Sequence, residues 1–87
     1  MKITKKNGSV VLYETDKLKN SILKANEEAP LEEMTPQMAS YLADEVFDRL
    51  AKEKDIITTQ DIRNCMHALL IESGLFQTAE RYMSYSK

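Results

Sequence analysis

The sequence predicts an α+β fold in which a small β-hairpin or a three-stranded sheet caps a bundle of four helices. Two observations support this prediction: an alternating run interrupted by Asn-Gly, and four later segments whose apolar residues recur at helical spacing. None of these helices can bury its apolar stripe alone, so a bundle closed by the sheet is the economical packing. We expect residues 1–87 to form a single domain.

The hairpin is expected over about residues 2–13. Ile3 before the turn, and Val10 and Leu12 after it, follow the period of two that is typical of a strand. Asn-Gly is the strongest short-range hairpin signal, because both residues tolerate a positive φ. A later run, residues 56–59, is rich in β-branched side chains and is a candidate third strand.

The first helix is expected from Asp16 to Ala29, with Thr15 or Asp16 as its N-cap. Lys17 then lies in the first turn, where a cation opposes the helix dipole by up to about 1 kcal/mol. A bound anion is favoured at the same place, so this lysine indicates a missing anion. The second helix should begin at Thr35-Pro36, an N-cap followed by proline at the first helical position.

The third and fourth helices follow a break in the pattern at residues 53–57. Thr58 and Asp61 have the spacing of a capping box, in its weaker aspartate form, and predict the start of the third helix. Gly74 is suited to the C′ position that ends it. The last helix is expected from Leu75 to about residue 85.

The distribution of charge says more about function than the net charge of −2. Residues 1–24 carry a balance of +4 and residues 25–61 a balance of −7. A basic end on an acidic body suits a compact polyanion such as a nucleotide, and it argues against a broad nucleic-acid surface. The alternative is a lysine-rich, solvated terminus. The sequence has neither a long apolar run nor a leader pattern, so we expect no membrane span and a cytoplasmic location.

The residues suited to catalysis or metal binding are few, so we expect no enzyme and no metal site. His67 is the only histidine and has no serine or cysteine at a suggestive spacing. Cys65 lies on an apolar helix face and is expected to be a small buried hydrophobe. A single cysteine also excludes an internal disulfide and a zinc ribbon. With two glycines, no glycine-rich phosphate loop can be written.

A nucleotide must therefore be held by other groups. Lys5, Lys6 and Lys17 can supply charge, and the backbone N–H groups at the start of the first helix can supply directed donors. Tyr13 and Leu18 can flank a base. The alternative is that Lys5 and Lys6 only protect an edge strand from aggregation.

Five short motifs, in order and over nearly the whole chain, resemble the ATP-cone domain. The motifs are Ile3-Thr4-Lys5-Lys6-Asn7-Gly8, Tyr13-Glu14-Thr15-Asp16-Lys17-Leu18, Ile22-x-x-Ala25, Ile57-Thr58-Thr59-Gln60-Asp61-Ile62 and Ala79-x-x-Tyr82-x-x-Tyr85. ATP-cones are regulatory modules of ribonucleotide reductases and of a related transcriptional repressor of reductase genes. The resemblance implies a four-helix bundle capped by a small sheet.

The resemblance also implies a ligand, partners and a site. The ligand would be ATP or dATP, with Mg²⁺, bound as an allosteric signal without turnover. The partners would be a ribonucleotide reductase catalytic subunit or other cone domains, including a second copy in a homo-oligomer. The implied nucleotide-binding residues are Lys5, Lys6, Gly8, Val11, Leu12, Tyr13, Glu14, Thr15, Asp16, Lys17, Leu18, Thr59, Ile62 and Arg63.

Two departures from the family pattern matter. The family usually has Lys-Arg-Asp-Gly where this chain has Lys-Lys-Asn-Gly, and lysine lacks the planar, bidentate grip of arginine on phosphate, so affinity is expected to be weaker. Residues 1–87 hold neither a catalytic barrel nor a zinc ribbon, so we expect an excised or free-standing regulatory domain. Two alternatives stay open: an interaction module that has lost its nucleotide, and, less favoured by the acidic charge, a DNA-binding regulator.

Overall fold

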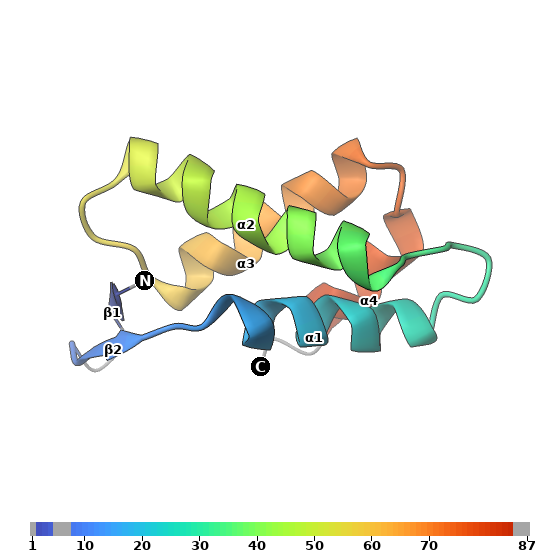
Figure 1. Ribbon diagram of the computed structural model, residues 1–87, viewed down its shortest axis with the longest axis horizontal. Helices are drawn as coiled ribbons and strands as arrows, with labels where there is room; N and C mark the ends of the chain where they lie inside the picture. The colour runs from blue at the N-terminus through green and yellow to red at the C-terminus, as the bar shows by residue number, and fades with distance from the viewer. Residues whose placement is uncertain (1, 5–7, 85–87) are drawn as a thin grey trace.

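The computed structural model describes residues 2–4 and 8–84, which form a two-stranded ribbon and four helices (Figure 1). The molecule is elongated, with principal extents of 38 × 25 × 19 Å. In chain order the elements are β1 (Lys2–Thr4), β2 (Val10–Leu12), α1 (Thr15–Glu27), α2 (Pro36–Glu53), α3 (Thr59–Glu72) and α4 (Phe76–Ser84).

The ribbon is antiparallel, with Ile3 paired to Val11 at its centre. Gly8 has a φ of +85°, the conformation for which a hairpin turn selects glycine, whereas Asn7 lies outside the described residues. Ile3 is buried, and Val10 and Leu12 on the other face are exposed. Side chains therefore alternate between the two faces of the ribbon, as the sequence predicts. The apolar side chains of Val10 and Leu12 lie on the face that is exposed to solvent.

The described sheet has two strands, and the candidate third strand is limited to a single bridge at Thr58. The reason is local. Thr58 is also the N-cap of α3, so the chain turns into the helix immediately after this residue. A residue that caps a helix cannot extend a strand beyond itself.

The four helices form a closed ring in which α1 packs against α2 and α4, and α3 packs against the same two helices. Figure 1 shows that the ribbon, the α2–α3 loop and the starts of α1 and α3 gather at one end, which we call the ribbon end. The α1–α2 loop, the start of α2 and the α3–α4 turn gather at the opposite end, which we call the loop end.

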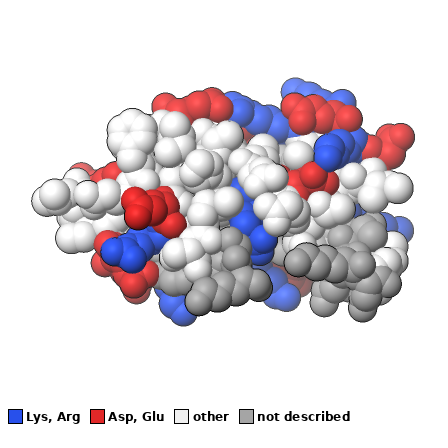
Figure 2. Space-filling view, turned by 180° about the vertical axis from the view of Figure 1, so that it is seen from behind, with Lys and Arg blue, Asp and Glu red and all other residues white. Residues whose placement is uncertain are grey.

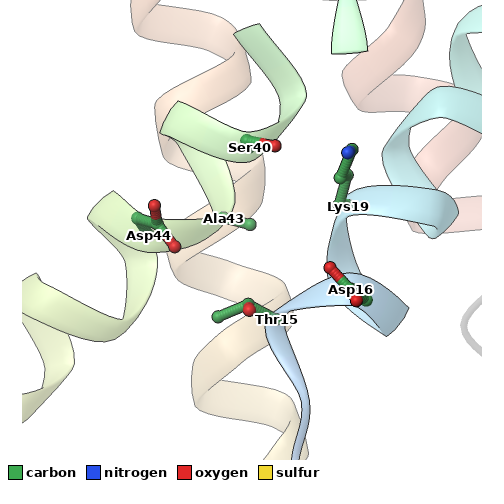
Figure 3. Close-up of a pocket in the computed structure, with 6 residues that line it drawn as sticks. All are labelled: Thr15, Asp16, Lys19, Ser40, Ala43 and Asp44. Carbon is green, nitrogen blue, oxygen red and sulfur yellow. The ribbon is translucent and has the colours of Figure 1, made fainter. Parts of the chain in front are cut away.

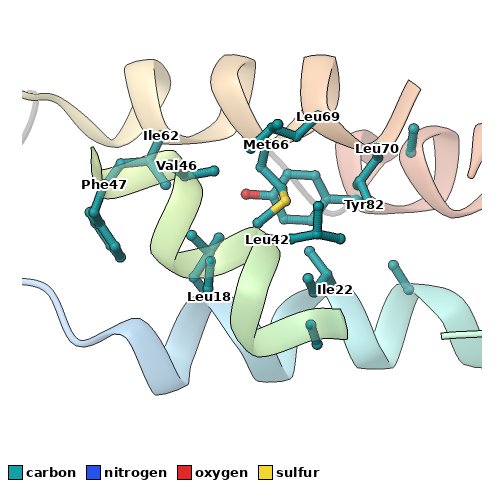
Figure 4. Close-up of a cluster of buried hydrophobic side chains, with 14 of the residues drawn as sticks. Leu18, Ile22, Leu42, Val46, Phe47, Ile62, Met66, Leu69, Leu70 and Tyr82 are labelled. Carbon is teal, nitrogen blue, oxygen red and sulfur yellow. The ribbon is translucent and has the colours of Figure 1, made fainter. Parts of the chain in front are cut away.

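The core runs through the ring and draws on all four helices (Figure 4). Leu18 and Ile22 of α1 and Met66 of α3 are fully buried, and Ile3 extends the same cluster into the ribbon. Burying an aliphatic side chain of this size stabilises a fold by about 1.5–3 kcal/mol. The helical spacing of the apolar residues in the sequence is the direct source of this packing.

The starts of α2 and α3 are capped as the sequence predicts. The Thr35 side chain accepts a hydrogen bond from the Met38 amide at 3.2 Å, with Pro36 at the first helical position. At α3 the capping box is complete: the Asp61 amide donates to Thr58 Oγ1 at 3.1 Å, and the Thr58 amide donates to the Asp61 carboxylate at 2.9 Å.

The start of α1 differs from the prediction. Its N-cap is Glu14, with φ −92° and ψ 137°, because Thr15 has already entered the helix. Among the described residues, the Glu14 side chain makes no capping hydrogen bond. The helix also ends at Glu27, two residues before the expected end at Ala29.

The start of α4 is capped by a residue that is distant in the sequence. The Glu32 carboxylate, in the α1–α2 loop, accepts hydrogen bonds from the Gln77 and Thr78 amides at 2.8 and 2.7 Å and from the Thr78 hydroxyl at 2.8 Å. Asn26 donates to the Glu32 carbonyl oxygen and to Thr78 Oγ1. The loop, α1 and α4 are thus held together by one polar cluster.

The remaining boundaries follow from backbone chemistry. The chain leaves α3 through Gly74, whose φ of +79° is the left-handed conformation expected at C′. The amide of Leu75 then donates to the Leu70 carbonyl oxygen at 2.8 Å, and α4 begins at Phe76. Of the helices in the described residues, none combines the length and hydropathy needed to cross a bilayer.

Candidate functional site

Three side chains from three different segments are coupled electrostatically. Tyr13 follows β2, Arg63 lies in the second turn of α3, and Tyr82 lies in α4. The positive charge of Arg63 acts on both tyrosine hydroxyls, and Tyr13 acts on the hydroxyl of Tyr82. We call these three residues the Tyr13–Arg63–Tyr82 cluster.

The tyrosine of the link is fixed by packing. The Tyr13 ring lies against Phe47 of α2, with ring centroids 5.8 Å apart and an interplanar angle of 54°. Arg63 is oriented by its own helix, because its guanidinium donates to Gln60 Oε1 at 3.0 Å. Both side chains are half-buried, so each keeps an open edge toward a ligand.

Burial raises the pKa of both tyrosine hydroxyls. For Tyr13 the desolvation is partly offset by the positive charge of Arg63. For Tyr82 desolvation is again the largest cause, Tyr13 adds to it, and Arg63 opposes it. Both phenols therefore stay neutral at physiological pH and can act as hydrogen-bond donors, with one cation beside them.

At the start of α1 the Glu14 side chain forms no capping hydrogen bond, and the Lys17 amide donates to the Glu14 carbonyl oxygen at 3.1 Å. Lys17 is exposed in this first turn, where its charge adds to the positive end of the helix dipole. Directed N–H donors beside an ammonium group are the arrangement that suits phosphate oxygens.

Two residues of the predicted site lie in the core. Leu18 and Ile62 are 0% and 2% exposed, so they form apolar packing beneath the surface and leave little area for a ligand (Figure 4). Thr59 is half-buried at the first position of α3, one turn before Arg63. The start of α3 therefore contributes one hydroxyl and one guanidinium at the surface.

The ribbon supplies the other predicted positions. Leu12 is 72% exposed, and Gly8 is exposed at the turn. Val11 occupies the central pair of the ribbon opposite Ile3. Lys5 and Lys6 lie outside the described residues, so their predicted contact with phosphates stays a prediction.

Two predicted residues face a different helix. Thr15 and Asp16 line a polar hollow of about 220 Å³ between α1 and α2, together with Lys19, Ser40, Ala43 and Asp44 (Figure 3). No residue of α3 lines it. Because successive helical residues point about 100° apart, Thr15 and Asp16 diverge from residues further along the same turn. The hollow and the Tyr13–Arg63–Tyr82 cluster are thus separate features of the ribbon end.

The candidates for catalysis have ordinary structural surroundings. Burial raises the pKa of the Cys65 thiol, with Arg49 opposing the effect, and the side chain packs against the core. A thiol of this kind is a poor nucleophile. Within residues 2–4 and 8–84, no three His, Cys, Asp or Glu side chains gather in a way that would hold a metal ion.

The molecular surface carries charges of both signs side by side. Figure 2 shows Lys and Arg atoms near the middle of the face opposite to that of Figure 1 and also along its edges, interspersed with Asp and Glu atoms.

Comparison with known families decides the identity. A family model for the ATP cone domain matches residues 1–87, the whole chain. The chain belongs to the ATP-cone family. ATP-cones are regulatory domains that bind ATP or dATP as allosteric signals and do not perform catalysis. No curated protein matches this ATP-cone.

Sequence reasoning missed two residues of this ATP-cone. Tyr82 was assigned to an apolar face, although its place in the Ala79-x-x-Tyr82 motif was a signal that it has a further role. Its hydroxyl, which Tyr13 and Arg63 influence, links α4 to the cluster. The sequence places Glu32 in an acidic loop. It caps α4, which begins 44 residues later at Phe76, and no local sequence pattern indicates a cap over this separation.

Proposed function

We propose that this ATP-cone binds ATP or dATP at the ribbon end and transmits the signal through contacts of its helical faces, without turnover. The observation that supports this best is the uncapped start of α1, which lies at the same end of the bundle as Tyr13 and Arg63. Amide donors, a lysine, a guanidinium and an aromatic ring are the groups that a nucleotide needs. Residues 1–87 act in this proposal as one regulatory domain.

The roles of individual residues follow from their chemistry. The phosphates would lie at the start of α1 against Lys17, with Lys5 and Lys6 approaching from the ribbon. The base would lie near Tyr13, Thr59 and Arg63, and the ribbon would close over the nucleotide through the exposed Leu12. Mg²⁺ would enter with the phosphates, because the described residues offer no metal cluster of their own.

The regulated activity in this proposal is that of a ribonucleotide reductase in the cytoplasm, through its activity or its assembly. A ligand shifts an equilibrium only through different affinities for two states. A single contact to the 2′-hydroxyl, worth about 1 kcal/mol, would separate ATP from dATP by only about fivefold. Strong discrimination therefore requires coupling to a larger rearrangement or to assembly.

Thermal unfolding with Mg-ATP, Mg-dATP, Mg-GTP and no ligand tests the proposal. A nucleotide at about 100 times its dissociation constant adds about 2.7 kcal/mol, which raises the Tm of a domain of this size by about 10 °C or more. Adenine nucleotides should produce this shift and GTP should not. An unchanged Tm at saturating nucleotide would leave an interaction module without a nucleotide as the better account.

A matched pair of lysine variants locates the site. Lys17→Ala should lower nucleotide affinity without lowering the Tm of the free protein, because the side chain is exposed and its charge opposes the helix dipole. Lys52→Ala removes an equally exposed lysine in the last turn of α2 and should leave affinity unchanged. Equal affinities for both variants would remove Lys17 from the site.

A further inference from the structure

The loop end carries an apolar hollow that lies outside the proposed nucleotide site. It has a volume of about 300 Å³ and is lined by Gln37, Met38, Tyr41, Leu42 and Ser73, between the start of α2 and the α3–α4 turn. Tyr41 is 66% exposed and Met38 is 40% exposed. A large aromatic and a thioether at the mouth of one hollow form a contiguous apolar surface, which monomeric proteins seldom leave without a use.

The loop end also has more apolar surface close to this hollow. Phe76, at the start of α4, and Leu31, in the α1–α2 loop, are both exposed. Each is next in the sequence to a residue of one hydrogen bond, because Glu32 accepts from the Gln77 amide. The α3–α4 turn, which supplies Ser73 to the hollow, leads directly into Phe76.

The surroundings of the hollow are strongly acidic. Residues 25–48 contain seven carboxylates and neither lysine nor arginine. Glu45 and Asp48 follow Tyr41 four and seven residues later, on the same side of α2, and Glu72 precedes Ser73. Arg49 joins Glu45 and Glu72 at 3.2 Å and so offsets part of this charge, which leaves a net negative surface.

We propose that the loop end binds a basic amphipathic helix of another protein, with an apolar side chain in the hollow and Lys or Arg side chains against the acidic rim. An apolar groove that accepts the apolar face of a helix is a recurring mode of peptide recognition. The charge complementarity defines the partner: an acidic segment would be repelled. This inference uses the end opposite to the nucleotide and does not rest on the proposed nucleotide site.

Titration calorimetry with a designed peptide tests the proposal. The probe is a peptide of about 18 residues with leucine on one helical face and lysine on the other, and its counterpart has glutamate in place of lysine. The lysine peptide should bind, more weakly as salt rises, and the glutamate peptide should not. Equal binding of both peptides would overturn the proposal.

Two variants locate the binding surface. Tyr41→Ala should weaken binding of the lysine peptide by about tenfold or more, as expected for an aromatic side chain at an interface centre. Ile56→Ala removes a side chain of the same 66% exposure at the ribbon end and should leave the affinity within about twofold. Equal effects of the two variants would overturn the assignment to the loop end.

The hollow could instead be covered by a second copy of this chain. Sedimentation of the protein without peptide distinguishes this dimer from a monomer. A monomer whose peptide binding is lost in Tyr41→Ala supports the proposal. Self-association that Tyr41→Ala abolishes, without binding of the lysine peptide, would overturn it in favour of a contact between copies.

Discussion

The starts of α1 and α4 present the same chemical problem and solve it in different ways. Each helix begins with amides that lack an intrahelical acceptor. At α4 the Glu32 carboxylate accepts three hydrogen bonds from the first turn, whereas at α1 the Glu14 side chain accepts none among the described residues. A side chain of the protein thus completes the start of α4, whereas the Glu14 side chain does not do so at α1, where our proposal places the nucleotide.

The largest effect should come from removing the cap of α4. We expect Glu32→Ala to lower the free energy of unfolding by about 2–3 kcal/mol, because two amides and the buried Thr78 hydroxyl lose their acceptor. Urea unfolding measures this change. Glu33→Ala, at the exposed neighbouring position, is the control and should change stability by less than about 0.5 kcal/mol.

The same cap should make stability depend on pH. Burial acts to raise the pKa of Glu32, but the hydrogen bonds from Gln77 and Thr78 prevail and hold it below its ordinary value of 4.5. As the pH falls, Glu32 is protonated in the unfolded chain before it is protonated in the folded one. The contribution of the Glu32 charge to the free energy of unfolding is therefore present above pH 4.5 and is lost as the pH falls through the folded pKa.

Comparison of the wild type with Glu32→Gln isolates this titration. The hydrogen bonds of Asp61 to Lys54 and of Glu72 to Arg49 lower the pKa of these carboxyls as well, but both remain in the variant. The difference in stability between the two proteins, measured by urea unfolding, should shrink as the pH falls below 4.5 and through the folded pKa of Glu32. A constant difference would show that the Glu32 charge is irrelevant to the cap.

The local caps should have intermediate effects. We expect Thr58→Ala to cost about 1–2 kcal/mol of stability, because the capping box at α3 loses its hydroxyl acceptor, and Thr35→Ala to cost about 1 kcal/mol. Thermal and urea unfolding of both variants would establish the order. A Thr35 effect larger than that of Glu32→Ala would contradict the ranking of these caps.

The smallest effect should come from the open start of α1. Glu14→Ala should change the stability of the free protein by less than about 0.5 kcal/mol, because no capping bond is lost. The control is Glu32→Ala in the same assay. A loss above about 1 kcal/mol would show that Glu14 caps α1 in solution, and the contrast between the two helix starts would disappear.

The features that the sequence predicted correctly are local ones. The capping box of Thr58 and Asp61 and the glycine at position 74 each depend on residues within one helical turn, so their spacing in the sequence is their geometry. The cap of α4 joins Glu32 to residues 45 and 46 positions later, and only the packed bundle brings them together.

The candidate site shows the same limit. The resemblance to ATP-cones pointed to both Tyr13 and Arg63, and the charge of Arg63 lowers the pKa of Tyr13 across two separate segments, against the larger effect of burial. It did not reveal that Thr15 and Asp16 turn toward α2, since a motif in sequence does not state which face of a helix each residue occupies. Nor did the apolar pattern of α4 reveal the polar role of the Tyr82 hydroxyl.

The tyrosines of this protein give it a built-in optical signal. The chain contains four tyrosines and no tryptophan, so tyrosine emission is not masked by energy transfer to an indole. The charge of Arg63 acts on the hydroxyls of Tyr13 and Tyr82, and Tyr41 lines the hollow at the loop end. Ultraviolet difference spectra can therefore follow events at either end of the molecule without an attached dye, once variants of single tyrosines assign each band.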